Sequence, residues 1–203
     1  MERERDVKKL LCDMTRLGIT LMIVCAVAAT GLAATYAVTW PVIQEQQRRK
    51  VLEENKELLK LFPGFQGDLT EKKELLEEAR KEFGDLESIF ELMSAGKRVG
   101  VAIKLASRGY GGPIKIAVGI DTEGKVAGVL VLDVSGETAG VGSKVAEAEG
   151  APFREQFKGK TAADALRVGK DVDAISGATI SSRGVASGVK NALVVYESYL
   201  KGG

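Results

Sequence analysis

The stretch VGVAIKLASRGYGGPIKIAVGIDTEGKVAGVLVLDV, residues 99–134, decides the fold of this chain. Apolar and β-branched residues dominate three runs within it, and these runs predict strands over 99–105, 114–120 and 125–134. The tetrapeptide Asp121-Thr122-Glu123-Gly124 predicts a tight turn between the last two runs. Strands that follow one another through short connections form an antiparallel meander.

The chain beyond this sheet is predicted to be mainly helical. Short helical pieces are expected at 145–149, 152–157 and 161–166, an extended segment at 171–175, and a long helix over 181–200. In the long helix, the spacing of apolar residues places Val185, Val189, Leu193 and Tyr196 on one face. A sheet with helices segregated beside it predicts a small α+β domain.

An uncharged apolar segment near the N-terminus predicts a single membrane span. No charged residue occurs from Leu17 to Ile43. A helix from Gly18 to Trp40 would be about 34 Å long, enough to cross a hydrocarbon core about 30 Å thick. A cleaved signal peptide is the alternative interpretation. Basic residues flank both ends of the segment equally, so the positive-inside rule leaves its orientation open.

Two charged, helix-forming segments, 44–61 and 70–83, follow the span, with Asp68 or Thr70 as the predicted N-cap of the second. These segments predict a helical stalk between the membrane and the domain. The predicted organisation is an N-terminal tail at 1–16, a transmembrane helix at 17–41, a helical stalk at 42–95 and a globular domain at 96–203.

The composition excludes several kinds of chemistry. The 203 residues include no histidine, which excludes Ser-His-Asp triads and imidazole metal sites. Cys12 and Cys25 both precede the predicted domain, so the domain has no thiol for nucleophilic attack or iron–sulfur ligation. The 29 basic and 28 acidic residues balance, whereas a nucleic-acid-binding chain usually carries a basic excess. We predict no catalytic side chain and no metal site, so any redox chemistry must come from a bound cofactor.

The segment from Asp173 to Ser182, DAISGATISS, is predicted to lead through a turn of small residues into the start of the long helix. Free N–H groups and the helix dipole favour a phosphate at such a start, and Gly177 and Ala178 let the backbone approach it closely. The alternative is that Ser181 or Ser182 caps the helix and that no ligand binds there.

The string Asp173-x-x-Ser176-Gly177-Ala178-Thr179 resembles the flavinylation motif of the FMN-binding domain family. This resemblance implies that Thr179 carries FMN through a phosphoester bond made by a dedicated flavin transferase. In that role Thr179 is a tether rather than a catalyst. Asp173 and Ser176 are then recognition or support residues.

The resemblance extends along nearly the whole chain. It includes the N-terminal span, the run Gly109 to Ile114 that opens a strand, the Glu137-Thr138 loop, and the segment from Phe153 to Phe157. These features together resemble the G subunits of the Rnf ion-translocating electron transport complexes.

This wider resemblance implies an electron carrier that works as one subunit of a translocase between ferredoxin and NAD, coupled to movement of Na⁺ or H⁺. It implies an inner-membrane, single-pass protein with a cytoplasmic N-terminus and an FMN domain outside the cytoplasm. The implied partners are other Rnf subunits, the flavin transferase and the lipid bilayer, with no nucleic acid.

The resemblance also implies further contacts with the flavin. Glu137, Thr138 and Gly140 belong to the loop expected at the ring, although Ala139 replaces the proline usual in the family, and the histidine often found before that loop is absent. Lys144, like Lys170, is a candidate cation for the reduced flavin, the alternative being an ordinary surface lysine. Tyr110 is expected either to stack on the ring or to pack against the sheet.

Three other functions are compatible with the same residues. The C subunit of the Na⁺-translocating NADH:quinone reductase shares the domain and the attachment motif but tends to be longer. A membrane-tethered interaction or sensory protein without redox activity would use the SGAT segment only as a helix cap. A freestanding flavin reductase would need a substrate pocket and a proton donor, for which the sequence gives no signal.

Overall fold

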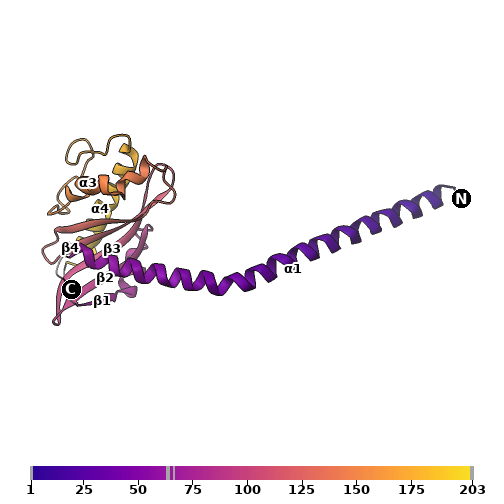
Figure 1. Cartoon of the computed structure of the whole chain (residues 1–203), viewed down its shortest axis with the longest axis horizontal. Helices are drawn as coiled ribbons and strands as arrows, with labels where there is room; N and C mark the ends of the chain where they lie inside the picture. The colour runs from indigo at the N-terminus through magenta and orange to yellow at the C-terminus, as the bar shows by residue number, and fades with distance from the viewer. Residues whose placement is uncertain (1, 63–64, 66, 202–203) are drawn as a thin grey trace. The chain divides into compact units, whose positions relative to one another are not determined.

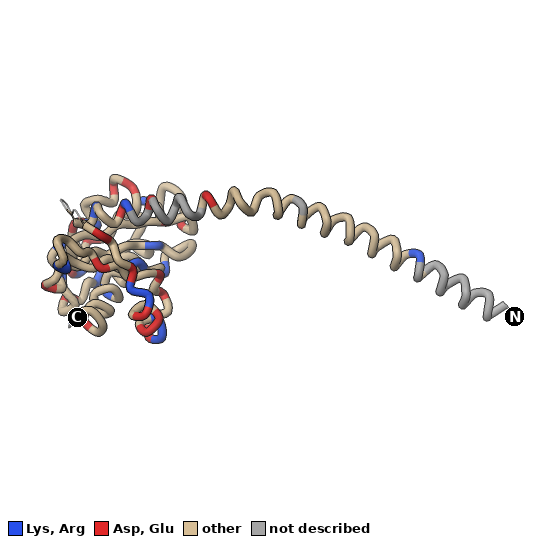
Figure 2. The backbone as a smooth tube through the Cα atoms, turned by 90° about the horizontal axis from the view of Figure 1, so that it is seen from below, with Lys and Arg blue, Asp and Glu red and all other residues tan. Residues whose placement is uncertain are grey.

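The computed structural model describes residues 2–62, 65 and 67–201, and the chain divides into two compact units, Met1–Glu53 and Glu54–Gly203. The first unit belongs to one long helix, α1 (Glu2–Leu58), which continues through Pro41 although proline supplies no N–H for the helical ladder. Within α1, the segment Arg16–Gln46 is long and apolar enough to cross a membrane, and none of its apolar window is buried in the chain. Figure 2 shows no charged residue along the middle of this helix. The predicted span at 17–41 lies inside this segment, but the predicted start of a separate stalk helix does not occur.

The second unit is built on a five-stranded antiparallel sheet with the strand order β1-β2-β3-β4-β5 (Figure 1). Its strands are β1 (Asp68–Glu71), β2 (Leu86–Ser94), β3 (Lys97–Arg108), β4 (Pro113–Asp121) and β5 (Val126–Asp133). The last three strands confirm the predicted meander. The turn between β4 and β5 is also confirmed, and Gly124 has a φ of 82° there.

The prediction of a helical stalk over 42–95 is wrong for the residues that form β1 and β2. Among the described residues of that range, only α1, the short 3-10 helix η1 (Leu59–Leu61) and α2 (Lys73–Ala79) are helical. Thr70 lies in β1 rather than at a helix start, because β1 pairs with β2 along its whole length. Strand β2 is buried on both faces, so its apolar residues Leu86, Ile89 and Phe90 fall at a spacing typical of a helix.

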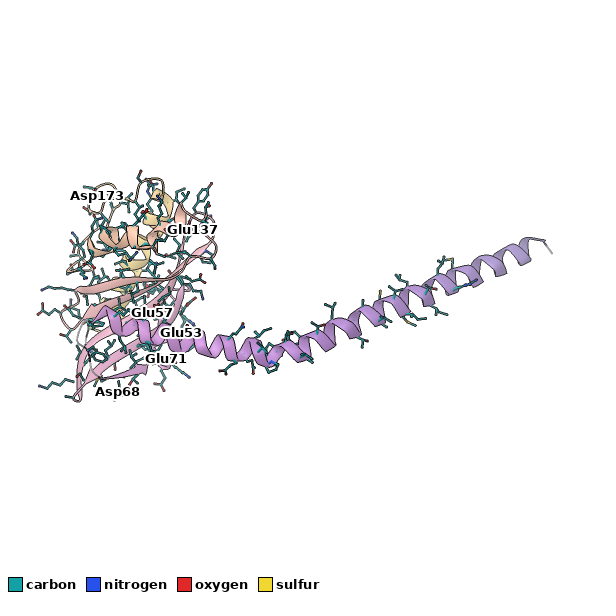
Figure 3. All side chains as sticks on the ribbon, viewed as in Figure 1. Glu53, Glu57, Asp68, Glu71, Glu137 and Asp173 are labelled. Atoms are coloured by element: carbon teal, nitrogen blue, oxygen red, sulfur yellow. The ribbon has the colours of Figure 1, made fainter. Side chains whose placement is uncertain are left out.

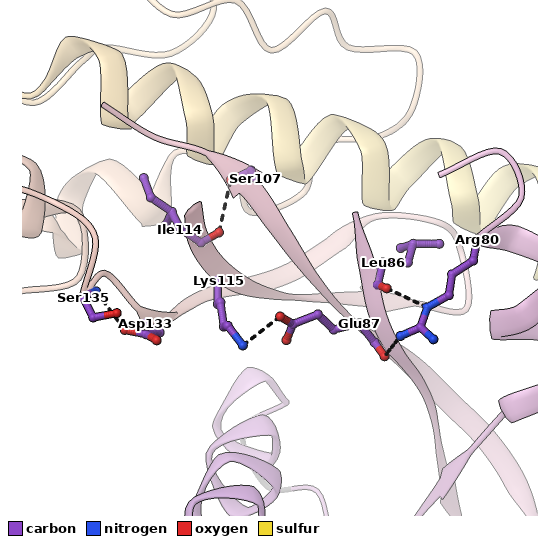
Figure 4. A network of polar contacts seen from close by, with 8 residues as sticks. All are labelled: Arg80, Leu86, Glu87, Ser107, Ile114, Lys115, Asp133 and Ser135. Carbon is purple, nitrogen blue, oxygen red and sulfur yellow. Dashed lines mark hydrogen bonds and ion pairs between the residues drawn. The ribbon is translucent and has the colours of Figure 1, made fainter. Parts of the chain in front are cut away.

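Polar contacts from other segments hold β2 in place (Figure 4). The Arg80 guanidinium donates to the carbonyl oxygens of Leu86 and Glu87, both at 2.9 Å. The Glu87 carboxylate pairs with Lys115 of β4 at 2.8 Å. A charged strand residue is therefore stabilised by partners that lie elsewhere in the sequence.

Both faces of the sheet are covered. On one face lies α4 (Thr179–Tyr199), whose four predicted apolar residues, Val185, Val189, Leu193 and Tyr196, are all buried. On the other face, Leu58, Leu61 and Phe62 pack against strand residues such as Leu92. The Phe62 ring lies where a Cβ on Gly100 would stand, so the sheet needs a glycine at that position.

The connection between β5 and α4 contains η2 (Gly142–Val145), η3 (Ala148–Gly150) and α3 (Ala151–Glu155). The predicted helix at 161–166 is wrong, because the Asp164 carboxylate accepts hydrogen bonds from the N–H and hydroxyl of Thr161, and Leu166 has a φ of 54°. The predicted extended segment at 171–175 forms no strand and contributes only an isolated bridge between Val172 and Val168.

Candidate functional site

A cleft of about 530 Å³ lies where the β3–β4 loop, the loop after β5 and the start of α4 meet. Its volume is within the range of small-ligand and cofactor sites, about 300–1,000 Å³. The predicted site residues among its lining are Tyr110, Glu137, Thr138, Gly177, Ala178 and Thr179. The structure thus brings together residues from three separated segments at one end of the sheet.

Glu137 joins the three segments that form the cleft. Its Oε1 accepts hydrogen bonds from the N–H groups of Tyr110 at 2.6 Å and Gly111 at 3.2 Å. Its Oε2 accepts a hydrogen bond from the Ser181 hydroxyl at 2.6 Å. Because both carboxylate oxygens are engaged within the protein, Glu137 fixes the distance between the β3–β4 loop and α4.

Two glycines make this position of the carboxylate possible. A Cβ at Gly109 would overlap Glu137 Oε1, and a Cβ at Gly142 would overlap Glu137 Oε2. The glycines of these two loops therefore serve the close approach of a charged side chain, in addition to any turn that they form.

The start of α4 has open hydrogen-bond donors. Among the described residues, no side chain caps α4, and no acceptor bonds the N–H groups of Thr179, Ile180 and Ser181. The alternative interpretation, a helix capped by Ser181 or Ser182, is wrong. The Ser182 hydroxyl donates to the Ala178 carbonyl at 2.9 Å, and the Ser181 hydroxyl donates to Glu137. The Thr179 side chain is exposed and lines the cleft beside these donors.

A tight turn precedes α4, as the small residues of this segment predict. The Ala178 N–H donates to the Ile175 carbonyl at 2.9 Å, and Gly177 has a φ of 78° within this turn. A left-handed residue at this point is favourable only for glycine. The turn directs the backbone of Gly177 and Ala178 to the cleft, where both residues line the wall.

Four predicted site residues lie outside the cleft lining: Asp173, Ser176, Gly140 and Lys144. Lys144 pairs with Glu149 at 3.4 Å, in agreement with an ordinary surface lysine. Asp173 has an exposed side chain, but its main chain is fixed by the amide of Gln156. Figure 3 shows Asp173 and Glu137 at the same end of the globular unit.

Four further residues line the cleft that were not predicted as site residues: Val141, Gly142, Ile180 and Ser181. Tyr110, Val141 and Ile180 form an apolar rim, with exposed fractions of 69%, 45% and 49%. Large apolar side chains are seldom so exposed without a reason when they gather at a cleft. The position of Ile180 directly after Thr179 was the one signal that the sequence offered.

These residues fit FMN. The apolar rim suits the flat face of an isoalloxazine ring, and the free N–H groups beside the Thr179 hydroxyl suit a phosphate. No cluster of metal-ligating side chains occurs among the residues that the structure describes.

Residues 109–194, which include every residue that lines the cleft, match the family model described as FMN-binding domain, so the chain contains an FMN-binding domain. The chain is 31% identical over 200 residues to the G subunit of the Na⁺-translocating ferredoxin:NAD⁺ oxidoreductase complex of Acetobacterium woodii, covering 92% of this chain and 93% of that protein. It is 33% identical over 186 residues to the G subunit of the ion-translocating oxidoreductase complex of Aliivibrio fischeri, covering 86% of each. The chain belongs to this family of G subunits, the Rnf family.

A third relative is the G subunit of the proton-translocating ferredoxin:NAD⁺ oxidoreductase complex of Clostridium ljungdahlii, which is 29% identical over 201 residues and matched over 95% of both chains. The relatives therefore include complexes named for Na⁺ and for protons.

Proposed function

We propose that this chain is a membrane-anchored electron carrier, one subunit of a complex that transfers electrons between ferredoxin and NAD and moves Na⁺ or H⁺. The observation that carries the proposal is the position of the exposed Thr179 hydroxyl, at the mouth of an apolar-rimmed cleft and at an uncapped helix start. The near full-length match to G subunits supports this function over that of the quinone reductase C subunit.

FMN is attached covalently in this proposal, through a phosphoester bond to the Thr179 oxygen made by a flavin transferase. Three N–H groups at the start of α4 are free to bind phosphate oxygens, and the dipole of a 21-residue helix favours negative charge at this end. When bound, FMN supplies the electron-accepting and electron-donating chemistry that the side chains lack.

The side chains of this domain hold and shield the cofactor. The apolar groups of Tyr110, Val141 and Ile180 exclude water from the ring. Glu137 keeps the loop and the helix at a fixed spacing, so that the distance to a partner's redox centre stays constant. An electron carrier needs no side-chain nucleophile and no imidazole, in agreement with the lack of histidine in the sequence.

The segment Arg16–Gln46 crosses the inner membrane in this proposal, with the N-terminus in the cytoplasm and the FMN domain outside it. Its length and its fully exposed apolar window support a lipid or subunit environment. The other subunits of the complex are the proposed partners of this chain.

The test is co-expression of the full chain with its flavin transferase, followed by intact-mass measurement and peptide mapping. We expect the wild type and Thr179→Ser to gain the mass of FMN less one water, because serine retains the attacking hydroxyl. Thr179→Ala should gain nothing. An unmodified wild type, or a Thr179→Ala variant that still carries FMN, would reject the proposal and favour a tethered protein without redox activity.

A further inference from the structure

A second recess, of about 450 Å³, lies along α4 on residues that follow those lining the first cleft, and the function above assigns it no role. It is lined by residues of α4 and of the loop before the flavinylation motif: Ala165, Leu166, Arg167, Val168, Arg183, Ala186, Ser187 and Lys190. Three of these side chains are cationic and none is acidic. Such a recess has the electrostatic character of an anion site.

The loop that carries Arg167 is held against α4. The partly buried Lys190 ammonium donates to the carbonyl oxygens of Ala162 at 2.5 Å and Asp164 at 2.8 Å. The side chain of Leu166, which has a positive φ, is buried in the main core. These contacts anchor the loop on both sides of the turn and leave Arg167 exposed at the recess.

Arg183 lies four residues after Thr179 on α4, so the two side chains share one face of the helix. Helical side chains lean towards the N-terminus, which directs Arg183 to the turn that contains Thr179. Within the described part of the chain, neither the Arg183 nor the Arg167 guanidinium has an ion pair or a hydrogen bond. Two guanidinium groups therefore remain available beside the attachment point.

We propose that Arg183 binds the phosphate group of the FMN attached at Thr179, a step that rests on the proposed function. A phosphodiester keeps one negative charge and two oxygens that are free to accept hydrogen bonds. The planar fork of a guanidinium matches two such oxygens, which an ammonium cannot do in the same way. Arg167 adds positive potential to the recess, and the free N–H groups of α4 face the same phosphate. In this arrangement Arg183, which lines the recess, binds the phosphate, and the flavin ring occupies the cleft.

Phosphorus-31 NMR of the flavinylated full chain in detergent tests this proposal directly. The variants are Arg183→Gln, which removes the charge, and Arg183→Lys, which keeps the charge but not the fork. Lys81→Gln is the matched control, because it also removes one exposed positive charge. Lys81 lies far from Thr179, because its neighbour Glu82 accepts a hydrogen bond from Tyr199, at the opposite end of α4.

We expect the phosphodiester resonance to shift in both Arg183 variants and to stay unchanged in Lys81→Gln. A resonance that is the same in Arg183→Gln and the wild type overturns the proposal. If Arg183→Gln loads no FMN, Arg183→Lys takes its place: a phosphodiester resonance that is the same in Arg183→Lys and the wild type overturns the proposal. A wild-type chain without FMN would instead reject the proposed function, before Arg183 is tested at all.

Discussion

The side-chain amide of Gln156 bonds both main-chain polar groups of Asp173. It donates to the Asp173 carbonyl at 3.3 Å and accepts from the Asp173 N–H at 2.8 Å. The segment at 171–175, predicted to be extended, forms no strand and is held by this pair of bonds instead. It fixes the backbone at the first residue of the flavinylation motif and leaves the Asp173 carboxylate in solvent.

Gln156→Ala removes both bonds. At a net value of about 0.5–1.5 kcal/mol per hydrogen bond, we expect the free energy of unfolding to fall by about 1–3 kcal/mol. Flavinylation should also slow, because the backbone of Asp173, the first residue of the predicted motif, loses the two bonds that fix it. The measurements are denaturant unfolding in detergent and a time course of FMN loading. Gln156→Glu keeps the acceptor for the Asp173 N–H and should load faster than Gln156→Ala. Equal loading rates in all three proteins would contradict this role.

Glu137→Ala should disrupt the cleft more than Ser181→Ala, because Glu137 accepts three hydrogen bonds and Ser181 donates one of them. We expect a loss of about 1.5–3 kcal/mol for Ser181→Ala, the net value of one hydrogen bond to a charged group, and a larger loss for Glu137→Ala, which removes three such bonds. Thermal unfolding of the two variants measures this order. A Glu137→Ala variant as stable as Ser181→Ala would show that the bonds to the β3–β4 loop contribute nothing.

Gly142→Ala should weaken the Glu137–Ser181 bond, because the added Cβ overlaps Glu137 Oε2. We expect a loss of more than about 1 kcal/mol from such overpacking. Gly84→Ala is the matched control, since a Cβ there meets nothing within 4 Å. We expect stability and FMN loading to fall in Gly142→Ala and to stay at wild-type values in Gly84→Ala. Wild-type stability and loading in both variants would show that the space at Gly142 is not needed.

Two hydrogen bonds from Thr161 lower the pKa of the Asp164 carboxyl below its usual value. The bond from the Thr161 N–H has the larger effect and the bond from its hydroxyl the smaller. The contribution of Asp164 to stability is therefore present above the unfolded-state pKa of aspartate, and it is lost as the pH falls through the lower folded-state pKa. We expect wild type to be more stable than Asp164→Asn at neutral pH and the difference to shrink in acid. Unfolding curves of both proteins across this range measure it, and a difference that grows in acid would refute the assignment.

Local pattern in the sequence determined the apolar helix, the three strands β3 to β5 and the buried face of α4. Each depends on neighbouring residues, through an uncharged run, β-branched content or helical spacing. The flavinylation motif is equally local, because a helix start with small residues is a property of one short segment. The sequence therefore predicted a helix start close to Thr179 without knowledge of the rest of the fold.

Only the tertiary structure decided the parts that depend on distant partners. Strand β2 carries Glu87 and has a helix-like apolar spacing, yet it is held as a strand by Lys115 and by pairing on both sides. At the cleft, the Ser181 hydroxyl donates a hydrogen bond to the Glu137 carboxylate, and the two residues are 44 positions apart in the sequence. A hydrogen bond needs its atoms within about 3 Å, and spacing along a chain does not encode that distance until the sheet and α4 have packed.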